Sequence, residues 1–197
     1  MALLSLFIWI QPGLTLPDGA GYYIYLPSTW IDGDLLFFNE WQRLGLIQNG
    51  IPVFKSATDT NHLGNHWTVG SALVWYPAFI AADIARAVVP SFAHFNRDGF
   101  VLPYNLGVVT ASTVAGIATL LAGYFISRRW FSARNAAIAA IATWFGSPLL
   151  WYSVRDAAMS HAVSALACAL IVWLSLRLRE RDTTEAAWAA GLAVGFA

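Results

Sequence analysis

The first charged side chain of the sequence belongs to Asp18, which directly follows an uncharged run over residues 1–17. A carboxylate at the point where a helix leaves a membrane is partly desolvated, and desolvation raises its basicity unless a cation or hydrogen bonds compensate. Asp18 is therefore a candidate general base for a substrate held at the membrane surface. The alternative is a helix-end or turn residue, since Asp18 precedes Gly19 and Asp-Gly is a common turn signal. Position alone favours this structural alternative.

A second group of polar side chains comprises Arg155, Asp156, Ser160 and His161, all within seven residues. Their spacing puts Asp156 and Ser160 on one face of a helix if that helix begins near Asp156. His161 would then lie one turn inside the next span, where polar groups are costly and often functional. The alternative is a structural Arg-Asp pair at the membrane boundary, with the histidine packed between helices. The pattern favours neither interpretation.

Two histidines, His62 and His66, have the i, i+4 spacing that lets two helical side chains bind one metal ion. A carboxylate from elsewhere, such as that of Glu40, would complete the site. Gly64 and Asn65 lie between the histidines and favour a loop, in which the spacing loses its geometric force. A divalent metal site and a loop without metal both stay open. The sequence has no HExxH, Walker, GxGxxG or GxSxG motif to support another cofactor or nucleophile.

These residues belong to a strongly apolar chain. Of its 197 residues, 58% are hydrophobic and 11% are charged, whereas about a quarter of the residues of soluble domains are charged. The composition excludes an ordinary soluble domain and a disordered chain. Basic and acidic residues number 11 each, so no basic excess indicates a nucleic-acid partner. The single cysteine, Cys168, excludes an internal disulfide framework and a thiolate metal cage.

Several runs are long enough to cross a membrane, which takes roughly 20 mostly apolar residues. Runs with at most a histidine charge extend over residues 104–127, 135–154 and 157–176. Residues 1–17 predict a shorter first span, with a cleaved signal peptide as the alternative, and residues 186–197 predict a span that is cut off. We expect an all-α polytopic membrane helix bundle of about four or five transmembrane helices in a single membrane domain. We also expect this chain to be the N-terminal part of a longer protein.

The run over residues 69–89 is apolar but contains Asp83, Arg86 and Pro77. It predicts either another span or an amphipathic helix in the membrane interface with its charges facing water. The interfacial interpretation places both arginine-rich segments, SRRWFSAR and RLRERD, in the cytoplasm, as the positive-inside rule favours. Residues 18–103 then form one long outer loop, which holds seven of the eleven acidic residues.

The outer loop contains a second predicted interfacial element over residues 27–47. Four of its aromatic side chains are expected at the depth of the lipid headgroups: Trp30, Phe37, Phe38 and Trp41. A loop of this length is usually functional. The sequence therefore predicts amphipathic helices that cover a pocket at the outer membrane surface.

Three stretches of this loop, DGAGYYIYL, GDLLFFNEW and NHWTVGSALVWYPAFIAADI, resemble the first outer loop of bacterial GT-C glycosyltransferases. The nearest resemblance is to protein O-mannosyltransferases and lipid A aminoarabinose transferases. Downstream, ISRRWFSARNAAIAAIATWFGSPLLWY is similar to their second and third helices, and SVRDAAMSHAVSALACAL to their second outer loop. One departure is Gly19, which occupies the second position of the Asp-Glu pair that the family commonly has.

The resemblance implies roles for individual residues. Asp18 would deprotonate the acceptor hydroxyl, and Asp156 would be the second acid. Arg155 would contact the donor phosphate, for which a guanidinium is a good charge match. The remaining implied pocket residues are Tyr22, Tyr23, Glu40, His66 and His161, of which Glu40 and His66 are also the candidate ligands of a divalent metal.

The implied activity is transfer of a sugar from a polyprenyl-phosphate donor to a lipid, glycan or protein acceptor. The expected location is the bacterial inner membrane, with the active face periplasmic or extracellular. Two other classes stay open, a fragment of a transporter or flippase and a small non-catalytic membrane protein. Transporters usually place ionisable residues near the membrane midplane, whereas this sequence keeps most of its acids in the outer loop.

Overall fold

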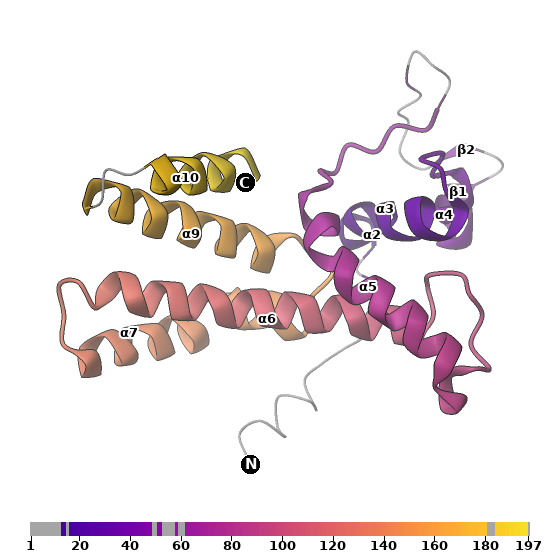
Figure 1. The fold of residues 1–197 in the computed structure, drawn as a ribbon. Helices are drawn as coiled ribbons and strands as arrows, with labels where there is room; N and C mark the ends of the chain where they lie inside the picture. Colours follow the sequence, from indigo (N-terminus) through magenta and orange to yellow (C-terminus); the bar gives the residue numbers. More distant parts are fainter. Residues whose placement is uncertain are drawn as a thin grey trace. The chain divides into compact units, whose positions relative to one another are not determined.

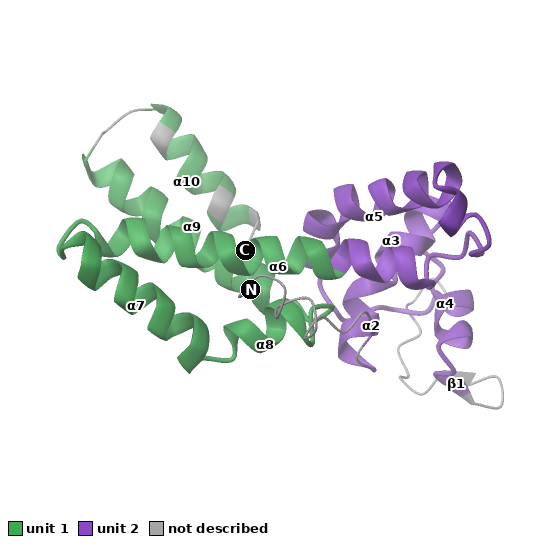
Figure 2. Cartoon of the chain, turned by 90° about the horizontal axis from the view of Figure 1, so that it is seen from below, with its two compact units in different colours: residues 1–11, 109–197 green, residues 12–108 purple. Residues whose placement is uncertain are grey.

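The computed structural model describes residues 13–14, 16–48, 51–52, 58, 62–180 and 184–196. Most of the predicted first span, residues 1–17, lies outside these residues. The chain divides into two compact units (Figure 2). Unit 2 is residues 12–108, and unit 1 includes residues 109–197. Each unit is described by itself below.

Unit 2 consists of short helical segments and one long helix, followed by the start of a second long helix (Figure 1). The elements are α2 (Asp18–Tyr23), α3 (Tyr25–Pro27), the π-helical turn η1 (Ser28–Asp32), α4 (Phe38–Arg43), α5 (Gly70–Val88), the 3-10 turn η2 (Pro90–Phe92) and α6 (Leu102–Ser127). Two short antiparallel strands, β1 (Ile47–Gln48) and β2 (Ile51–Pro52), pair with each other. The fold is therefore mostly helical, as predicted, with one small strand pair.

The segment from Asp18 to Asp32 is nearly continuous helix until Gly33, whose φ of 75° ends it. Glycine adopts this left-handed conformation without the steric penalty of a side chain. Helices α2 and α3 pack against α5. The turn at Gly33 ends this helical segment, so α4 forms as a separate helix.

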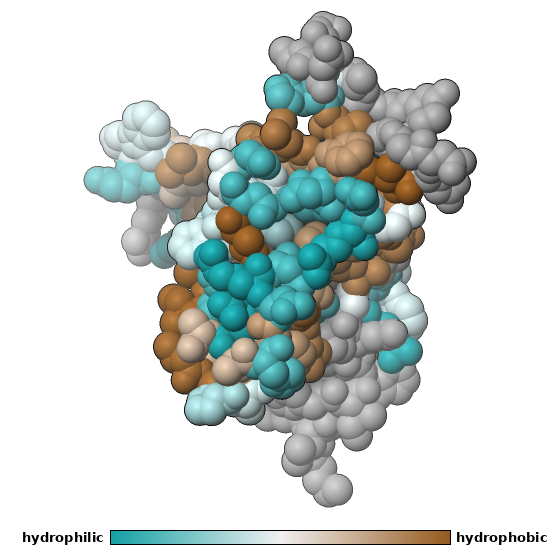
Figure 3. Space-filling view, turned by 90° about the vertical axis from the view of Figure 1, so that its right-hand side faces the viewer, coloured by the Kyte–Doolittle hydropathy of each residue, from teal (hydrophilic) through white to brown (hydrophobic). Residues whose placement is uncertain are grey.

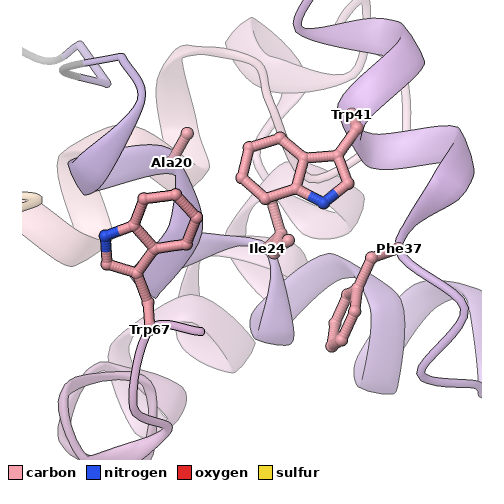
Figure 4. Packing of buried hydrophobic residues seen from close by; sticks show 5 residues of the cluster. All are labelled: Ala20, Ile24, Phe37, Trp41 and Trp67. Carbon is pink, nitrogen blue, oxygen red and sulfur yellow. The ribbon is translucent and has the colours of Figure 1, made fainter. Parts of the chain in front are cut away.

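Two groups of buried side chains hold unit 2 together. The first is the aromatic cluster of Ala20, Ile24, Phe37, Trp41 and Trp67 (Figure 4). Phe37 and Trp41 are only 5% and 4% exposed, so both side chains pack inside the unit, and their expected position at the depth of the lipid headgroups stays a prediction. Each finds an aromatic partner inside the unit, because Phe37 packs edge-on against Tyr25 at 5.1 Å and Trp41 lies 5.7 Å from Trp67.

The second buried group joins α2, α5 and α6 through aromatic rings. The ring of Tyr23 lies 6.0 Å from that of Phe79 and 5.8 Å from that of Phe100. Phe79 in turn lies 4.8 Å from Tyr104. Close approach of α5 and α6 requires Gly107, since a Cβ there would lie 2.8 Å from the carbonyl oxygen of Ala78. Small residues allow such backbone contacts between apolar helices.

Three described helices are long and apolar enough to cross a membrane: Gly70–Val88 (α5), Leu102–Ser127 (α6) and His161–Glu180 (α9). The prediction of a membrane protein rich in helices is consistent with this finding. Helix α5 corresponds to the run of residues 69–89. Its Asp83 is only 7% exposed and is paired inside unit 2, so the expected water-facing position of this charge was wrong.

The rest of α6 belongs to unit 1, together with α7 (Ala133–Gly146), α8 (Leu149–Val154), α9 (His161–Glu180) and α10 (Thr184–Phe196). Helix α7 begins after Ser132, whose hydroxyl caps it by accepting the backbone N–H of Asn135. The predicted run over 135–154 is not one helix. It breaks at Ser147, which has φ −129° and ψ 165°, because the residue before a proline avoids the helical region.

Helix α9 is shifted from the predicted run over 157–176. The helix begins at His161, and residues 155–160 form turns. The backbone oxygen of Ala157 accepts a hydrogen bond from the Ser112 hydroxyl at 2.5 Å, and that of Ser153 accepts one from Thr113 at 2.7 Å. These side-chain bonds satisfy carbonyl groups around the turn and hold it against α6. The predicted truncated span, residues 186–197, overlaps α10, which packs along α9.

Candidate functional site

Three segments that contain predicted site residues meet at the aromatic cluster of unit 2. Ala20 and Ile24 belong to the helices that start at Asp18, Trp41 follows Glu40 on α4, and Trp67 follows His66. Gly21 permits the contact with Trp67, because a Cβ at that position would lie 2.1 Å from the indole ring. Asn65 adds a 2.7 Å hydrogen bond from its amide nitrogen to the Gly21 oxygen.

Asp18 is the first residue of α2 and is exposed. Within the part of the chain that the structure describes, its carboxylate has no hydrogen-bond or ion-pair partner. A carboxylate in the first turn of a helix interacts favourably with the backbone N–H groups there. Asp18 is thus an accessible acceptor at the start of α2, a position compatible with both the general-base and the helix-end interpretations.

Glu40 differs from the other acids of unit 2 that the structure describes. Its side chain lies in the first turn of α4, is 1% exposed, and has no hydrogen-bond donor on either carboxylate oxygen among the described residues. Burial, and to a lesser degree the neighbouring carboxylates of Asp32 and Asp34, raises the pKa of Glu40 to about 7. At neutral pH the side chain therefore exists in both protonated and ionised forms, which suits a group that transfers protons.

The acid cluster, defined as Asp32, Asp34 and Glu40, is held by local hydrogen bonds. The amide of Asn39 donates to Asp32 at 2.8 Å. The Ser28 hydroxyl and the backbone N–H of Leu36 both donate to Asp34 Oδ1, at 3.1 Å each. Asp32 and Asp34 therefore keep their positions beside Glu40, and a protonated Glu40 can donate to Asp32.

Hydrophilic side chains gather on one face of the molecule, which Figure 3 shows and which lies on the right of Figure 1. Among the exposed polar residues of unit 2 are Asp32, Asn39, Arg43, Asn96 and Arg97. Arg43 forms an ion pair with Asp98, and its guanidinium lies over the ring of Phe100 at 5.5 Å. The predicted outer loop is therefore a folded unit with a polar surface and an aromatic interior.

The two predicted pocket tyrosines have different environments. Tyr22 is half-buried and packs against the aromatic cluster. Tyr23 is fully buried, and its hydroxyl donates to the backbone oxygen of Gly99. Burial raises the pKa of Tyr23 well above its ordinary value. Tyr23 therefore connects α2 to residue 99 as a structural side chain, and Tyr22 is the better candidate of the pair for contact with a ligand.

The predicted metal ligands do not form a metal site in the described residues. His62 and His66 are exposed and lie outside any helix, so the i, i+4 argument does not apply. The His66 ring stacks on Trp67 at a centroid distance of 3.6 Å. Among the described residues, no three His, Cys, Asp or Glu side chains are grouped so that they could hold a metal ion. The structure thus ties His66 to the aromatic cluster.

Sequence reasoning missed the most extensively paired carboxylate, that of Asp83. Its oxygens accept hydrogen bonds from Trp30 Nε1 at 3.0 Å, Tyr104 OH at 2.6 Å, Arg97 Nη2 at 3.0 Å and Arg86 Nε at 3.4 Å. A carboxylate has about four acceptor positions, so none is left for a substrate. Asp83 is a structural cross-link. The sequence signal that could have indicated a buried ion pair was Asp83 together with Arg86 within an apolar run.

Unit 1 carries the other predicted site residues. Arg155 is exposed, with its guanidinium 5.9 Å from the centre of the Trp151 ring, and Asp156 is half-buried in the turn. Asp156 and Ser160 would share a helix face only if a helix began near Asp156, and that condition is not met, because α9 begins at His161. His161 is consequently at the helix start, exposed, with its ring 4.1 Å from that of Tyr152. The turn keeps Arg155 and His161 accessible.

Comparison of the chain with family models, with curated proteins and with solved structures gives no match. The features that bear on function are therefore the residues of unit 2 and the membrane-length helices. The main chemical feature of unit 2 is the acid cluster next to the aromatic cluster, with Asp18 exposed on a neighbouring element.

Proposed function

We propose that this chain is part of a membrane glycosyltransferase that takes a sugar from a polyprenyl-phosphate donor. The observation that carries the proposal is Glu40, a buried carboxyl without a hydrogen-bond donor whose pKa is about 7. A group that titrates near neutral pH is matched to general acid-base work. Sugar transfer from a lipid phosphate needs such a group and needs no nucleotide-binding fold.

The reaction requires one proton transfer. The acceptor hydroxyl oxygen attacks the anomeric carbon, its proton passes to a carboxylate, and the bond from the anomeric carbon to the phosphate oxygen breaks. The leaving group is the polyprenyl phosphate. Asp18 is the proposed proton acceptor because it is exposed, and Glu40 is proposed to exchange protons and to shape the acceptor side of the pocket. Arg155, Asp156 and His161 are proposed to act on the donor from their own turn.

Two structural features support this proposal. Helices α5, α6 and α9 are long and apolar enough to cross a membrane, the phase in which a polyprenyl chain dissolves. Residues 12–108 form a folded unit with an aromatic interior, which is suited to hold groups in place at a membrane surface. The bacterial inner membrane, a periplasmic active face and a lipid, glycan or protein acceptor are further parts of the proposal.

The test uses the whole chain in proteoliposomes loaded with polyprenyl-phosphate mannose or polyprenyl-phosphate aminoarabinose. Donor binding and release of polyprenyl phosphate are both measured, with the hydroxyl of water as the acceptor, so that release accompanies hydrolysis of the sugar from its carrier. Asp18→Asn is expected to lose at least about a hundredfold in release, in the range of a lost general base, while donor binding is retained. The matched control is Glu185→Gln, which removes an exposed acid from α10 and should change neither measurement.

The results distinguish a glycosyltransferase from the flippase alternative. Full release by Asp18→Asn would remove Asp18 from the mechanism. A wild-type chain that binds neither donor would overturn the proposed function. Movement of intact donor between leaflets without cleavage would favour the flippase alternative. Far-ultraviolet circular dichroism of each variant verifies that its helices are intact.

A further inference from the structure

An apolar groove lies between α6 and α7 in unit 1, whose helices are labelled in Figure 1. Its volume is about 240 Å³, and it is lined by Leu120, Leu121, Tyr124, Ala137, Ala140, Ile141, Trp144 and Phe145. Apart from the Tyr124 hydroxyl and the Trp144 indole N–H, these side chains offer nothing to a polar ligand. The groove is therefore suited to a hydrocarbon chain rather than to a sugar, a nucleotide or a peptide backbone.

Two arginines continue the groove toward the turn that joins these helices. Arg128 follows Tyr124 by four residues, and its backbone N–H donates to the Tyr124 oxygen at 2.9 Å, so the helical geometry extends to it. Arg134 precedes Ala137 by three residues on α7. Residues three or four apart share a helix face. Arg128 and Arg134 thus lie one turn beyond the apolar lining, each on the side of its helix that lines the groove.

The charges at this end of the groove are uneven. Arg129 is paired with Glu180. Arg128 contacts only a neutral group among the described residues, because its Nη1 donates to the backbone oxygen of Phe131 at 2.7 Å. Arg134 is exposed and has no acidic partner in the described part of the chain. Two positive charges consequently stay available to an anion at the end of an apolar channel.

The same turn has the composition of a membrane interface. It follows directly on α6, a helix of membrane length. Trp130 and Phe131 are 63% and 59% exposed, and exposed aromatic rings beside arginines are typical of the headgroup region. The apolar groove, the aromatic rings at the turn and the two arginines without an acidic partner among the described residues follow one another in this order. They match the acyl chain, the glycerol region and the phosphate of one phospholipid molecule.

We propose that the α6–α7 groove binds an anionic phospholipid, with an acyl chain against Tyr124, Ala140 and Ile141 and the phosphate between Arg128 and Arg134. Basic pockets between membrane helices are known to hold acidic lipid headgroups. A zwitterionic phospholipid has the same chain but adds a cation that the two arginines repel. This site depends on α6 lying in a membrane and is independent of the proposed sugar transfer.

The test measures binding of dioleoylphosphatidylglycerol and dioleoylphosphatidylcholine to the detergent-solubilised chain by native mass spectrometry. The wild type is expected to bind the glycerol lipid in preference. Each arginine near a membrane surface contributes about a fivefold change in binding, so Arg128→Gln with Arg134→Gln should weaken phosphatidylglycerol binding about 30-fold. The matched control is Arg177→Gln with Arg179→Gln, which removes the same charge from the end of α9 and should change it less than about threefold.

A third variant separates a groove from a general charge effect. Ala140→Phe fills the groove without a change of charge and should weaken binding of both lipids. The proposal is overturned if the wild type binds the two lipids equally, if both arginine pairs lower binding to the same extent, or if Ala140→Phe leaves phosphatidylglycerol binding unchanged. Thermal unfolding of each variant verifies that a loss of binding does not reflect a loss of folding.

Discussion

Replacement of Glu40 by glutamine tests the central observation, because it removes the titration but keeps the shape of the side chain. The pKa of Glu40 is about 7 in the folded chain, against 4.5 as its ordinary value. Between these values the folded chain binds more protons than the unfolded chain, so the free energy of unfolding must fall as pH rises. The loss begins near pH 4.5 and is complete above pH 7.

The size of this loss follows from the shift in pKa. One pKa unit corresponds to 1.36 kcal/mol, so the ionised Glu40 lowers the free energy of unfolding by at most about 3 kcal/mol at pH 8. The glutamine amide brings its own desolvation penalty of about 1–3 kcal/mol, but that penalty is the same at both pH values. The predicted quantity is therefore a change with pH. The difference in free energy of unfolding between wild type and Glu40→Gln is measured at pH 5 and again at pH 8, and the two differences are compared.

Tryptophan fluorescence during thermal unfolding in detergent is a suitable assay, because Trp41 and Trp67 lie in the adjacent cluster. For a chain of this size, about 3 kcal/mol corresponds to a change in Tm of roughly 6–12 °C. Part of the loss has already occurred at pH 5, so Glu40→Gln should gain about 2.5 kcal/mol, or roughly 5–10 °C in Tm, relative to wild type between pH 5 and pH 8. Glu185→Gln, an exposed acid, should show no such gain. Equal pH profiles for wild type and Glu40→Gln would refute the raised pKa.

Two further predictions concern packing in unit 2. Gly21→Ala should destabilise the chain by about 1–3 kcal/mol, because the new Cβ overlaps the Trp67 ring; Gly123→Ala, which meets nothing within 4 Å, should not lower the Tm. Asp83→Asn should cost about 2–4 kcal/mol, since Arg97 loses its ion-pair partner. Chemical denaturation in detergent measures that second change, and an unchanged stability would show that the carboxylate is not a structural cross-link.

Hydropathy along the chain was enough to predict helices of membrane length. The run over 104–127 corresponds closely to α6, Leu102–Ser127. Transfer of apolar side chains out of water is nearly additive along a segment, so a local sum predicts which helices enter a membrane. The same property explains why the run over 69–89 qualified as a span in spite of its charges.

Helix boundaries needed more than hydropathy. The start of α9 at His161 depends on a turn that Ser112 and Thr113 of α6 hold by hydrogen bonds to carbonyl oxygens more than 30 residues away in the sequence. The break at Ser147 had a local signal in the following Pro148, since a proline restricts the residue before it. Hydrogen bonds between distant segments left no comparable pattern.

The sequence by itself determined that the chain is mostly helical, with apolar helices long enough to cross a membrane, and it determined the identity of the acidic residues. Only the tertiary structure decided which of these carboxylates receive hydrogen bonds. Asp83 accepts them from Trp30 and Tyr104, which are 53 and 21 residues away in the sequence, whereas Glu40 is buried without a donor among the described residues. The basicity of a carboxyl depends on its burial and on the donors within a few ångströms. Both quantities arise from contacts between segments that are far apart in the chain.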